Sequence, residues 1–301
     1  MKLLVTGASG QVGWELVRSL MPLGEVVACD RTQCDLLRPD SLADVVAKVG
    51  PDVIVNAAAY TAVDKAESEE ALAQIVNRDA VKALALAAQA AGALLVHYST
   101  DYVFNGRKSA PYVEDDEPNP INAYGRSKLA GERAIRNSGC EYLIFRTSWV
   151  YAARGRNFLR TMLRLAGERD ELDVVADQIG TPNWARNIAD VTAHVIGRVG
   201  AERMANTRVS DVYHLTASGS VSWHGFAEAI LDIAGKRGLL RAGRSRPLLR
   251  AIPTEAYPQP AARPRNSRLA AERLKERFGV ALPDWPKSLA LCMQEMIGND
   301  V

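Results

Sequence analysis

Near its amino end the chain reads KLLVTGASGQVG, from Lys2 to Gly13. The apolar start of this run predicts a short strand, and its end leads into an amphipathic pattern of helical period. Glycines lie between the two. The first allows a tight turn, the second lets a pyrophosphate approach the backbone, and the third lets helix and strand pack closely. Free N–H groups at the start of the helix would face the same anion. The predicted phosphate cradle consists of Gly7, Gly10, Gln11, Val12 and Gly13.

Further short apolar runs follow at regular distances, separated by longer amphipathic segments. The runs are continuous rather than alternating, which is typical of strands covered on both faces. Strand and helix in alternation predict an α/β fold, a doubly wound parallel sheet of the Rossmann type. After the first strand we expect strands at residues 26–28, 53–55, 94–96 and 143–145, and helices at 12–20, 41–49, 68–91 and 122–138.

The rhythm loosens after residue 150. We expect residues 1–150 to form a dinucleotide-binding Rossmann domain. Residues 151–301 would mainly form a smaller C-terminal substrate-binding lobe, interleaved with the last strands of the sheet. Residues 241–264 are dense in Arg and Pro and indicate loop or extended chain. The other elements expected here are helices near 157–168, 222–236, 267–277 and 286–297 and strands near 172–175 and 212–215.

The composition is that of an ordinary globular protein, with 48% hydrophobic and 24% charged residues. A formal net charge of +2 gives no reason to expect nucleic acid or an anionic membrane as a partner. No apolar run approaches the roughly 20 residues that span a bilayer. The cysteines, with no CxxC pair, indicate reduced thiols and a cytoplasmic protein. They are Cys29, Cys34, Cys140 and Cys292.

The end of the second predicted strand carries opposing signals about the cofactor. A carboxylate at Asp30 would accept hydrogen bonds from ribose hydroxyls, which favours NADH. The next residue, Arg31, could instead attract the 2′-phosphate of NADPH, so both cofactors stay open. Asp35 and Leu36 could flank the adenine or belong to a solvated loop. The small Ala57, Ala58 and Ala59 at the end of the third strand are also expected at the cofactor.

A phenol and an ammonium, Tyr124 and Lys128, are four residues apart on one predicted helix face. Lowering a phenol's pKa by about three units takes about 4 kcal/mol, which a fixed ammonium and a nicotinamide charge can provide. Thr100 ends the fourth strand, at the edge where α/β sheets bind ligands. It could donate to a substrate carbonyl oxygen while Tyr124 gives the proton. This order of residues predicts a ketone reductase.

With these residues in hand, the chain resembles the extended short-chain dehydrogenase/reductase family and, within it, the dTDP-4-dehydrorhamnose reductase family. The most specific segments are VIVNAAAYTAVDKAE at residues 53–67 and TSWVY at residues 147–151. The resemblance covers nearly the whole chain. It is also carried by residues 7–16, 97–104, 124–132 and 263–269.

The resemblance implies reduction of the 4-keto group of dTDP-6-deoxy-L-lyxo-4-hexulose by NADPH or NADH, giving dTDP-L-rhamnose. Tyr124 would be the general acid, and Lys128 would lower its pKa and hold the nicotinamide ribose. Thr100 would polarise the carbonyl, Asp101 would bind a sugar hydroxyl, and Trp149 would pack on the sugar. From the residues alone, Trp149 could equally be core. Arg263, Arg265 and Arg268 could clamp the diphosphate, or form a solvated basic loop.

Some members of the family are described as dimers bridged by magnesium through carboxylates, one of them on the first helix, where this chain has Glu15. The others should come from the segment after residue 182, which here carries a basic Arg186. A cation there would repel a metal that requires oxygen ligands. We therefore expect no magnesium site, and we leave a homodimer open.

Other functions on this fold stay open. A nucleotide-sugar 4,6-dehydratase would need an acid beside Asp101, where this chain has Tyr102, and a 4-epimerase would recycle a tightly held NAD. A non-catalytic subunit, such as the regulatory partner of methionine adenosyltransferase, need not keep Thr100, Tyr124 and Lys128. The nucleotide on the sugar, thymidine or uridine, is not distinguished by the residues.

Overall fold

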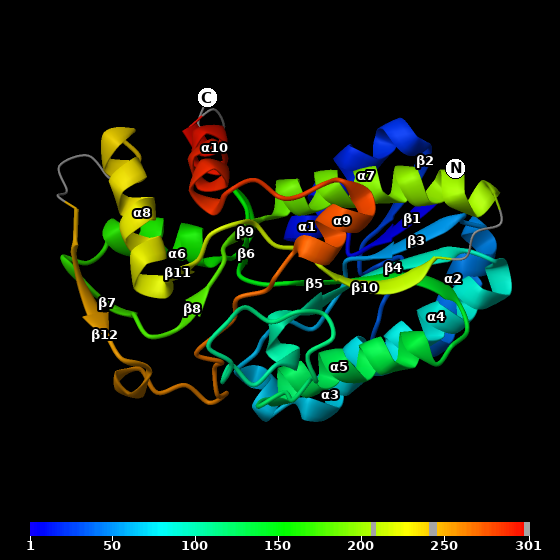
Figure 1. The fold of residues 1–301 in the computed structure, drawn as a ribbon, viewed down its shortest axis with the longest axis horizontal. Helices are drawn as coiled ribbons and strands as arrows, with labels where there is room; N and C mark the ends of the chain where they lie inside the picture. Colours follow the sequence, from blue (N-terminus) through cyan, green and yellow to red (C-terminus); the bar gives the residue numbers. More distant parts are fainter. Residues whose placement is uncertain (206–208, 241–245, 298–301) are drawn as a thin grey trace.

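A six-stranded parallel sheet forms the centre of the protein. The structure is a computed structural model that describes residues 1–205, 209–240 and 246–297 (Figure 1). The strand order is β10-β5-β4-β3-β1-β2, and every neighbouring pair is parallel. The strands are β1 (Lys2–Thr6), β2 (Glu25–Cys29), β3 (Val53–Asn56), β4 (Leu94–Thr100), β5 (Glu141–Thr147) and β10 (Ser210–His214).

Helices cover both faces of this sheet, as Figure 1 shows. Successive strand residues point to opposite faces, so Leu3 and Val5 pack with α1, α7 and α9, whereas Leu4 packs with α2 and α4. This confirms the doubly wound Rossmann-type sheet predicted from the continuous apolar runs. The helices are α1 (Gln11–Leu20), α7 (Ala185–Met204) and α9 (Glu272–Phe278) on one face, and α2 (Leu42–Val49), α4 (Ala80–Ala91) and α5 (Ala123–Arg136) on the other.

The helix expected at residues 68–91 contains a change of pitch. It consists of α3 (Glu70–Gln74), a π-helical turn (Ile75–Asp79) and α4. The π turn brings the buried Asn77 side chain to the backbone of Tyr60, donating to its carbonyl at 3.0 Å and accepting from its N–H at 2.9 Å. The turn thereby ties the loop after β3 to the helical layer.

The twenty-residue helix α7 was not predicted. Its start has no side-chain cap, and Gly197 and Gly200 interrupt it, so the usual signals of a helix are weak. Apolar residues spaced seven and four apart, such as Ile188, Val195 and Val199, are fully buried against the sheet. They were the signal in the sequence that could have predicted it.

Residues after 150 contribute to two hydrophobic cores. Helix α7, strand β10 and helix α9 complete the core under the sheet. A second core, in the lobe, contains the buried Tyr151, Leu159, Phe226 and Leu289. Its elements are α6 (Phe158–Ala166), α8 (Trp223–Lys236), α10 (Trp285–Ile297) and the parallel pair β7 (Glu171–Val175) and β12 (Leu248–Ile252).

One expectation about the last third of the chain needs correction. Residues 248–252, expected as loop or extended chain, are extended and form strand β12, while residues 241–245 lie outside the described residues. The helix expected at 267–277 begins only at Glu272, because Asn266 and Leu269 form bridges to Ile179 and Tyr112. Two further short pairs lie outside the six-stranded sheet: β6 (Val150–Tyr151) with β9 (Asn183–Trp184), and β8 (Ile179–Gly180) with β11 (Val221–Ser222).

None of the helices within the described ranges has the length and apolar character that crossing a bilayer requires.

Candidate active site

A cavity of about 690 Å³ opens along the carboxyl edge of the sheet, where α/β folds bind their ligands. It joins the glycine-rich turn after β1, the ends of β3 and β4, and the first turns of α5. Most of the predicted cofactor and catalytic residues meet here although they come from distant parts of the chain. Those that line it are Gly7, Gly10, Gln11, Val12, Asp35, Leu36, Ala57, Ala58, Ala59, Tyr124 and Lys128.

The glycine turn leaves room that side chains would fill. Gly7 has φ 68°, and a Cβ there would lie 2.8 Å from the Ala58 backbone. Gly13 lies behind the cavity, where a Cβ would come within 2.0 Å of the Gly7 carbonyl oxygen. The N-cap of α1, Gly10, has no side chain to satisfy the N–H groups of the first turn. The turn and helix end are therefore suited to hold a pyrophosphate.

The two residues after β2, Asp30 and Arg31, have different surroundings in the structure. The Asp30 carboxylate accepts from the Thr32 hydroxyl at 2.6 Å and from the Thr32 N–H at 2.8 Å, and these bonds lower its pKa. Arg31, by contrast, lines the cavity and is mostly exposed, with Asp35 at 3.5 Å. The expected ribose-binding carboxylate is thus engaged by its own loop, and a cation faces the cavity.

Tyr124 stands at the start of α5, on the wall of the cavity. The Asn122 side chain caps this helix by accepting from the Gly125 N–H at 2.8 Å, which fixes where the first turn begins. The Thr100 hydroxyl lies near the Tyr124 phenol and acts on its pKa. This hydroxyl also donates to the Asp101 carboxylate at 3.1 Å. Helix start and strand end therefore place a phenol, a hydroxyl and a carboxyl together.

Burial raises the pKa of the Tyr124 phenol, while the nearby Thr100 hydroxyl opposes this rise. That Lys128 and a nicotinamide charge lower this pKa stays a prediction. The Lys128 ammonium nitrogen is turned under the sheet edge, where it donates to the Tyr98 carbonyl oxygen at 2.6 Å and lies 3.1 Å from His97 Nε2. Burial lowers the pKa of Lys128 to about 8.

Asp101 is 3% exposed, and burial raises its pKa to about 6, against the hydrogen bond from Thr100. A buried carboxyl beside a ketone-binding position can accept a hydrogen bond from a sugar hydroxyl. Its role in binding a sugar hydroxyl stays a prediction.

Trp149 has an unusual backbone conformation, with φ 45°. Its ring stacks on that of Trp223, with centroids 3.5 Å apart, and Gly180 leaves the space that the ring needs. Non-glycine residues in the left-handed region are strained, and such strain is concentrated at functional sites. The stack gives the lobe a flat aromatic surface near the end of β5.

Arg263 lines a different, basic cavity of about 560 Å³ between the sheet domain and the lobe. It is held by Asp64 at 2.8 Å and by the Ala261 carbonyl at 3.1 Å. Arg265 pairs with Glu255. The cationic side chains around this cavity are Arg107, Lys108, Arg263, Arg265 and Arg268, of which the sequence analysis had not considered the first two.

Arg156 is a further residue that the sequence analysis missed. It lines the main cavity from the loop after β6, together with Gly155. Asn157 fastens this loop to the glycine turn by donating to the Gln11 side chain at 2.8 Å. The Arg-Gly-Arg run at 154–156, a basic loop directly after a strand, was the available signal.

Arg186 lies between two carboxylates rather than beside a metal ligand set. Its guanidinium binds Glu15 at 3.1 Å and Glu295 at 2.7 Å, and Arg18 also binds Glu15, at 3.2 Å. Within the described residues no group of three or more His, Cys, Asp or Glu side chains could hold a metal ion.

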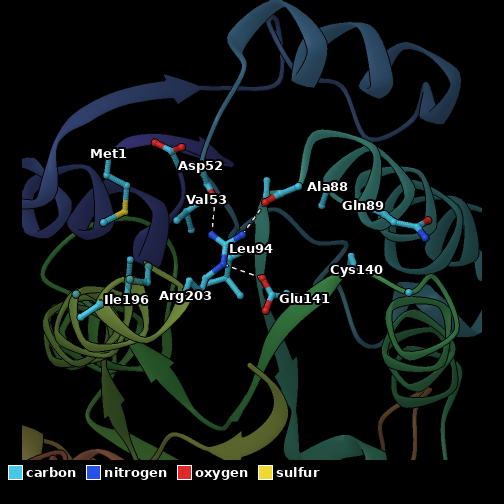
Figure 2. Close-up of a pocket in the computed structure, with 16 residues that line it drawn as sticks. Met1, Asp52, Val53, Ala88, Gln89, Leu94, Cys140, Glu141, Ile196 and Arg203 are labelled. Carbon is cyan, nitrogen blue, oxygen red and sulfur yellow. Dashed lines mark hydrogen bonds and ion pairs between the residues drawn. The ribbon is translucent and has the colours of Figure 1, made fainter. Parts of the chain in front are cut away.

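Another cavity, of about 960 Å³, lies at the opposite edge of the sheet, near the starts of β3, β4 and β5 (Figure 2). Arg203 reaches across it to Glu141 at 2.8 Å and to the Gly92 and Asp52 carbonyl oxygens at 2.6 and 3.1 Å. The guanidinium of Arg203 is therefore already bound by protein atoms. The size of this cavity alone does not make it the active site.

Comparison with known proteins now identifies the family. A family model described as RmlD substrate binding domain matches residues 1–297. A dTDP-4-dehydrorhamnose reductase of Burkholderia thailandensis is 56% identical over 304 residues, covering 99% of this chain and 100% of that protein. The chain belongs to the dTDP-4-dehydrorhamnose reductase family. The resemblance stated from the sequence is thereby confirmed.

Other members of the dTDP-4-dehydrorhamnose reductase family agree. The reductase of Escherichia coli K12 is 48% identical, and the match covers 98% of each chain. The crystal structure of the Bacillus anthracis reductase, in complex with NADP, superposes with a TM-score of 0.86. The two sequences are 35% identical, and the match covers 98% of this chain and 99% of that one. A UDP-glucose 4-epimerase of Thermus thermophilus, 17% identical with a TM-score of 0.79, shares the fold.

Proposed function

We propose that this protein catalyses the NAD(P)H-dependent reduction of the 4-keto group of dTDP-6-deoxy-L-lyxo-4-hexulose (dTDP-4-dehydrorhamnose), giving dTDP-L-rhamnose. The observation that carries this proposal is the meeting of Thr100 and Tyr124 beside a cavity whose other end is a glycine cradle. The relatives that cover the full chain are named for this reduction.

The main cavity suits a dinucleotide. The glycine turn and the amino end of α1 would hold the pyrophosphate, and Arg31 would lie toward the adenosine end. Ala57, Ala58 and Ala59 would leave room for the cofactor along the strand end, and Lys128 would hold the nicotinamide ribose. A reduced nicotinamide, when bound, supplies the hydride.

The protein's own residues manage the proton and the substrate. Thr100 donates to the ketone oxygen, and Tyr124 gives that oxygen its proton as the alcohol forms. The raised pKa of Tyr124 keeps the phenol protonated near neutral pH, the form that an acid needs. Asp101 accepts from a sugar hydroxyl, and the Trp149 ring packs against the sugar.

The nucleotide diphosphate would lie in the basic cavity lined by Arg263. On this proposal residues 1–150 form the cofactor domain, and residues 151–301 mainly form the substrate lobe, with α7, β10 and α9 returned to the sheet domain.

We further propose a homodimer and a cytoplasmic location. The half-exposed Trp14, next to Glu15, and Leu291, one turn before Glu295, offer apolar surface around the charged cluster of Arg186. All four cysteines are buried free thiols, which suits a reducing compartment. The molar mass from light scattering, measured with and without a chelator, would test the dimer. The mass of a monomer would contradict it.

The test of the function couples the purified protein to the 4-keto sugar and follows NADPH and NADH absorbance, with product stereochemistry read by NMR. We expect consumption of reduced cofactor and a product of L-rhamno configuration. Protein that carries stoichiometric NAD and consumes no reduced cofactor would instead indicate an epimerase or dehydratase.

A further inference from the structure

The loop between β6 and α6 carries two arginines, Arg154 and Arg156, on either side of Gly155. Gly155 has φ 73°, a left-handed conformation that glycine adopts without strain. The two arginines beside this turn have different surroundings. The Arg154 guanidinium lies over the Trp14 ring of α1, 3.4 Å from its centroid, whereas Arg156 lines the main cavity. One arginine therefore contacts the protein, and the other faces the space for a ligand.

The side chain of Asn157 fastens this loop to the first turn of α1. Its Nδ2 donates to Gln11 Oε1 at 2.8 Å and to the carbonyl oxygens of Ala152 and Arg154 at 2.9 and 3.1 Å. Its Oδ1 accepts from the Arg160 N–H at 3.0 Å and so caps α6. One side chain thus joins the start of α6, the loop and the start of α1. The position of Arg156 beside the glycine turn is therefore fixed by the fold.

The cationic side chains that line the main cavity are Arg31, Lys128 and Arg156. Arg31 lies 3.5 Å from the Asp35 carboxylate, and the Lys128 ammonium donates to the Tyr98 carbonyl oxygen at 2.6 Å. Arg156 is exposed, and it forms no side-chain hydrogen bond or ion pair with a residue in the described part of the chain. Its charge is therefore available to an anion in the cavity.

The glycine turn and the amino end of α1 offer N–H groups and a partial positive charge, but no cationic side chain stands between Gly7 and Gly13. A pyrophosphate carries two negative charges in a dinucleotide, which these N–H groups alone do not neutralise. A guanidinium can donate to two phosphoryl oxygens at once through its planar fork. Arg156 supplies this group at the same end of α1, because its loop is bound to Gln11.

We propose that Arg156 binds the pyrophosphate of the nicotinamide dinucleotide, opposite the N–H groups of the glycine turn. The inference deepens the cofactor site of the proposed function and so rests on it. The pyrophosphate is common to NADPH and NADH, so Arg156 contributes to the binding of both. Arg31, toward the adenosine end, would by contrast distinguish the two cofactors.

The test measures equilibrium binding by calorimetry, without substrate and without turnover. The ligands are NADPH, NADH and ADP-ribose, which keeps the pyrophosphate but lacks the nicotinamide. We expect Arg156→Ala to raise Kd for all three ligands about tenfold, the effect of losing a hydrogen-bonded charge. Arg156→Lys keeps the charge without the planar fork and should raise Kd by a smaller factor.

Arg169→Ala is the matched control. Arg169 is exposed just after α6 and does not line the main cavity, so the variant loses the same charge at a distance from the ligand. We expect its Kd values to equal those of the wild type. A tenfold rise in this control as well would overturn the proposal, because the effect would then come from net charge.

Salt dependence separates a charge contact from a change of loop structure. Raising the ionic strength from about 0.05 to about 0.5 M screens exposed charges and should weaken ADP-ribose binding to the wild type. The Arg156→Ala variant should show a smaller salt effect, since it lacks the screened contact. Equal salt effects in the two proteins would contradict a direct contact between Arg156 and the phosphates.

The ligands also distinguish failure of this proposal from failure of the proposed function. Wild-type protein that binds all three ligands, with unchanged Kd values in Arg156→Ala, would overturn the role of Arg156 alone. A loss confined to NADPH would also overturn it, because Arg156 would then contact the 2′-phosphate. Wild-type protein that binds none of the ligands would contradict both this proposal and the reductase function.

Discussion

Arg146 and Glu132 form a bidentate ion pair in which each side chain is only 1% exposed. The pair joins β5 to α5, and Arg146 also donates to the Glu114 carbonyl oxygen at 3.3 Å. Glu132 lies one turn after Lys128 and two turns after Tyr124. The same contact that holds the helix on the sheet therefore sets the depth of the catalytic side chains.

Glu132→Gln should lower the free energy of unfolding by about 3 to 5 kcal/mol, because it leaves the Arg146 charge buried without a counterion. Urea unfolding measures this. Arg164 and Glu168 form a pair whose side chains are 59% and 50% exposed, so Glu168→Gln should change stability by less than about 1 kcal/mol. Equal costs for the two variants would contradict this account of the buried pair.

Tyr124→Phe should lower turnover at least ~100-fold, since it removes the group that protonates the ketone, and should leave NADPH binding intact. Stopped-flow turnover and cofactor fluorescence separate the two effects. Tyr257→Phe, at a half-exposed position, should retain full activity. Unchanged turnover in Tyr124→Phe would remove this residue from its role.

Arg31→Ala should raise KM for NADPH about tenfold, the effect of about 1.4 kcal/mol, and leave KM for NADH unchanged. Arg31 lines the cavity, whereas the Asp30 carboxylate is engaged by Thr32 and is not turned to a ribose. Initial rates with both cofactors measure this preference. Arg136→Ala, exposed at the far end of α5, is the control. A parallel loss with both cofactors would rule out recognition of the 2′-phosphate.

Asp101 should make stability depend on pH. Burial raises its pKa from 3.8 to about 6, so its contribution to stability is present below about pH 4 and is lost as pH rises through about 6. The Asp101→Asn variant stays neutral at every pH. Its free energy of unfolding, relative to that of the wild type, should therefore rise by on the order of 2 kcal/mol between about pH 4 and 7. Urea unfolding at both pH values tests this. Asp173→Asn, at an exposed position, should show no such trend.

The glycine turn and the Tyr124–Lys128 pair could be predicted because both depend on local chain geometry. A strand, a turn with Gly7 and a helix start lie within residues 2–13, and a spacing of four places two side chains on one helix face. Helix α7 was missed because its stability comes from burial against the sheet rather than from caps or propensity.

The sequence by itself determined the doubly wound sheet, the glycine turn after the first strand and the helix that carries Tyr124 and Lys128, because period, glycine positions and strand ends are properties of adjacent residues. Tertiary structure decided which of Asp30 and Arg31 faces the cavity, and that Arg186 meets Glu15 across 171 positions of the chain. These depend on the direction of side chains from separate elements, and on the requirement that every buried donor find an acceptor.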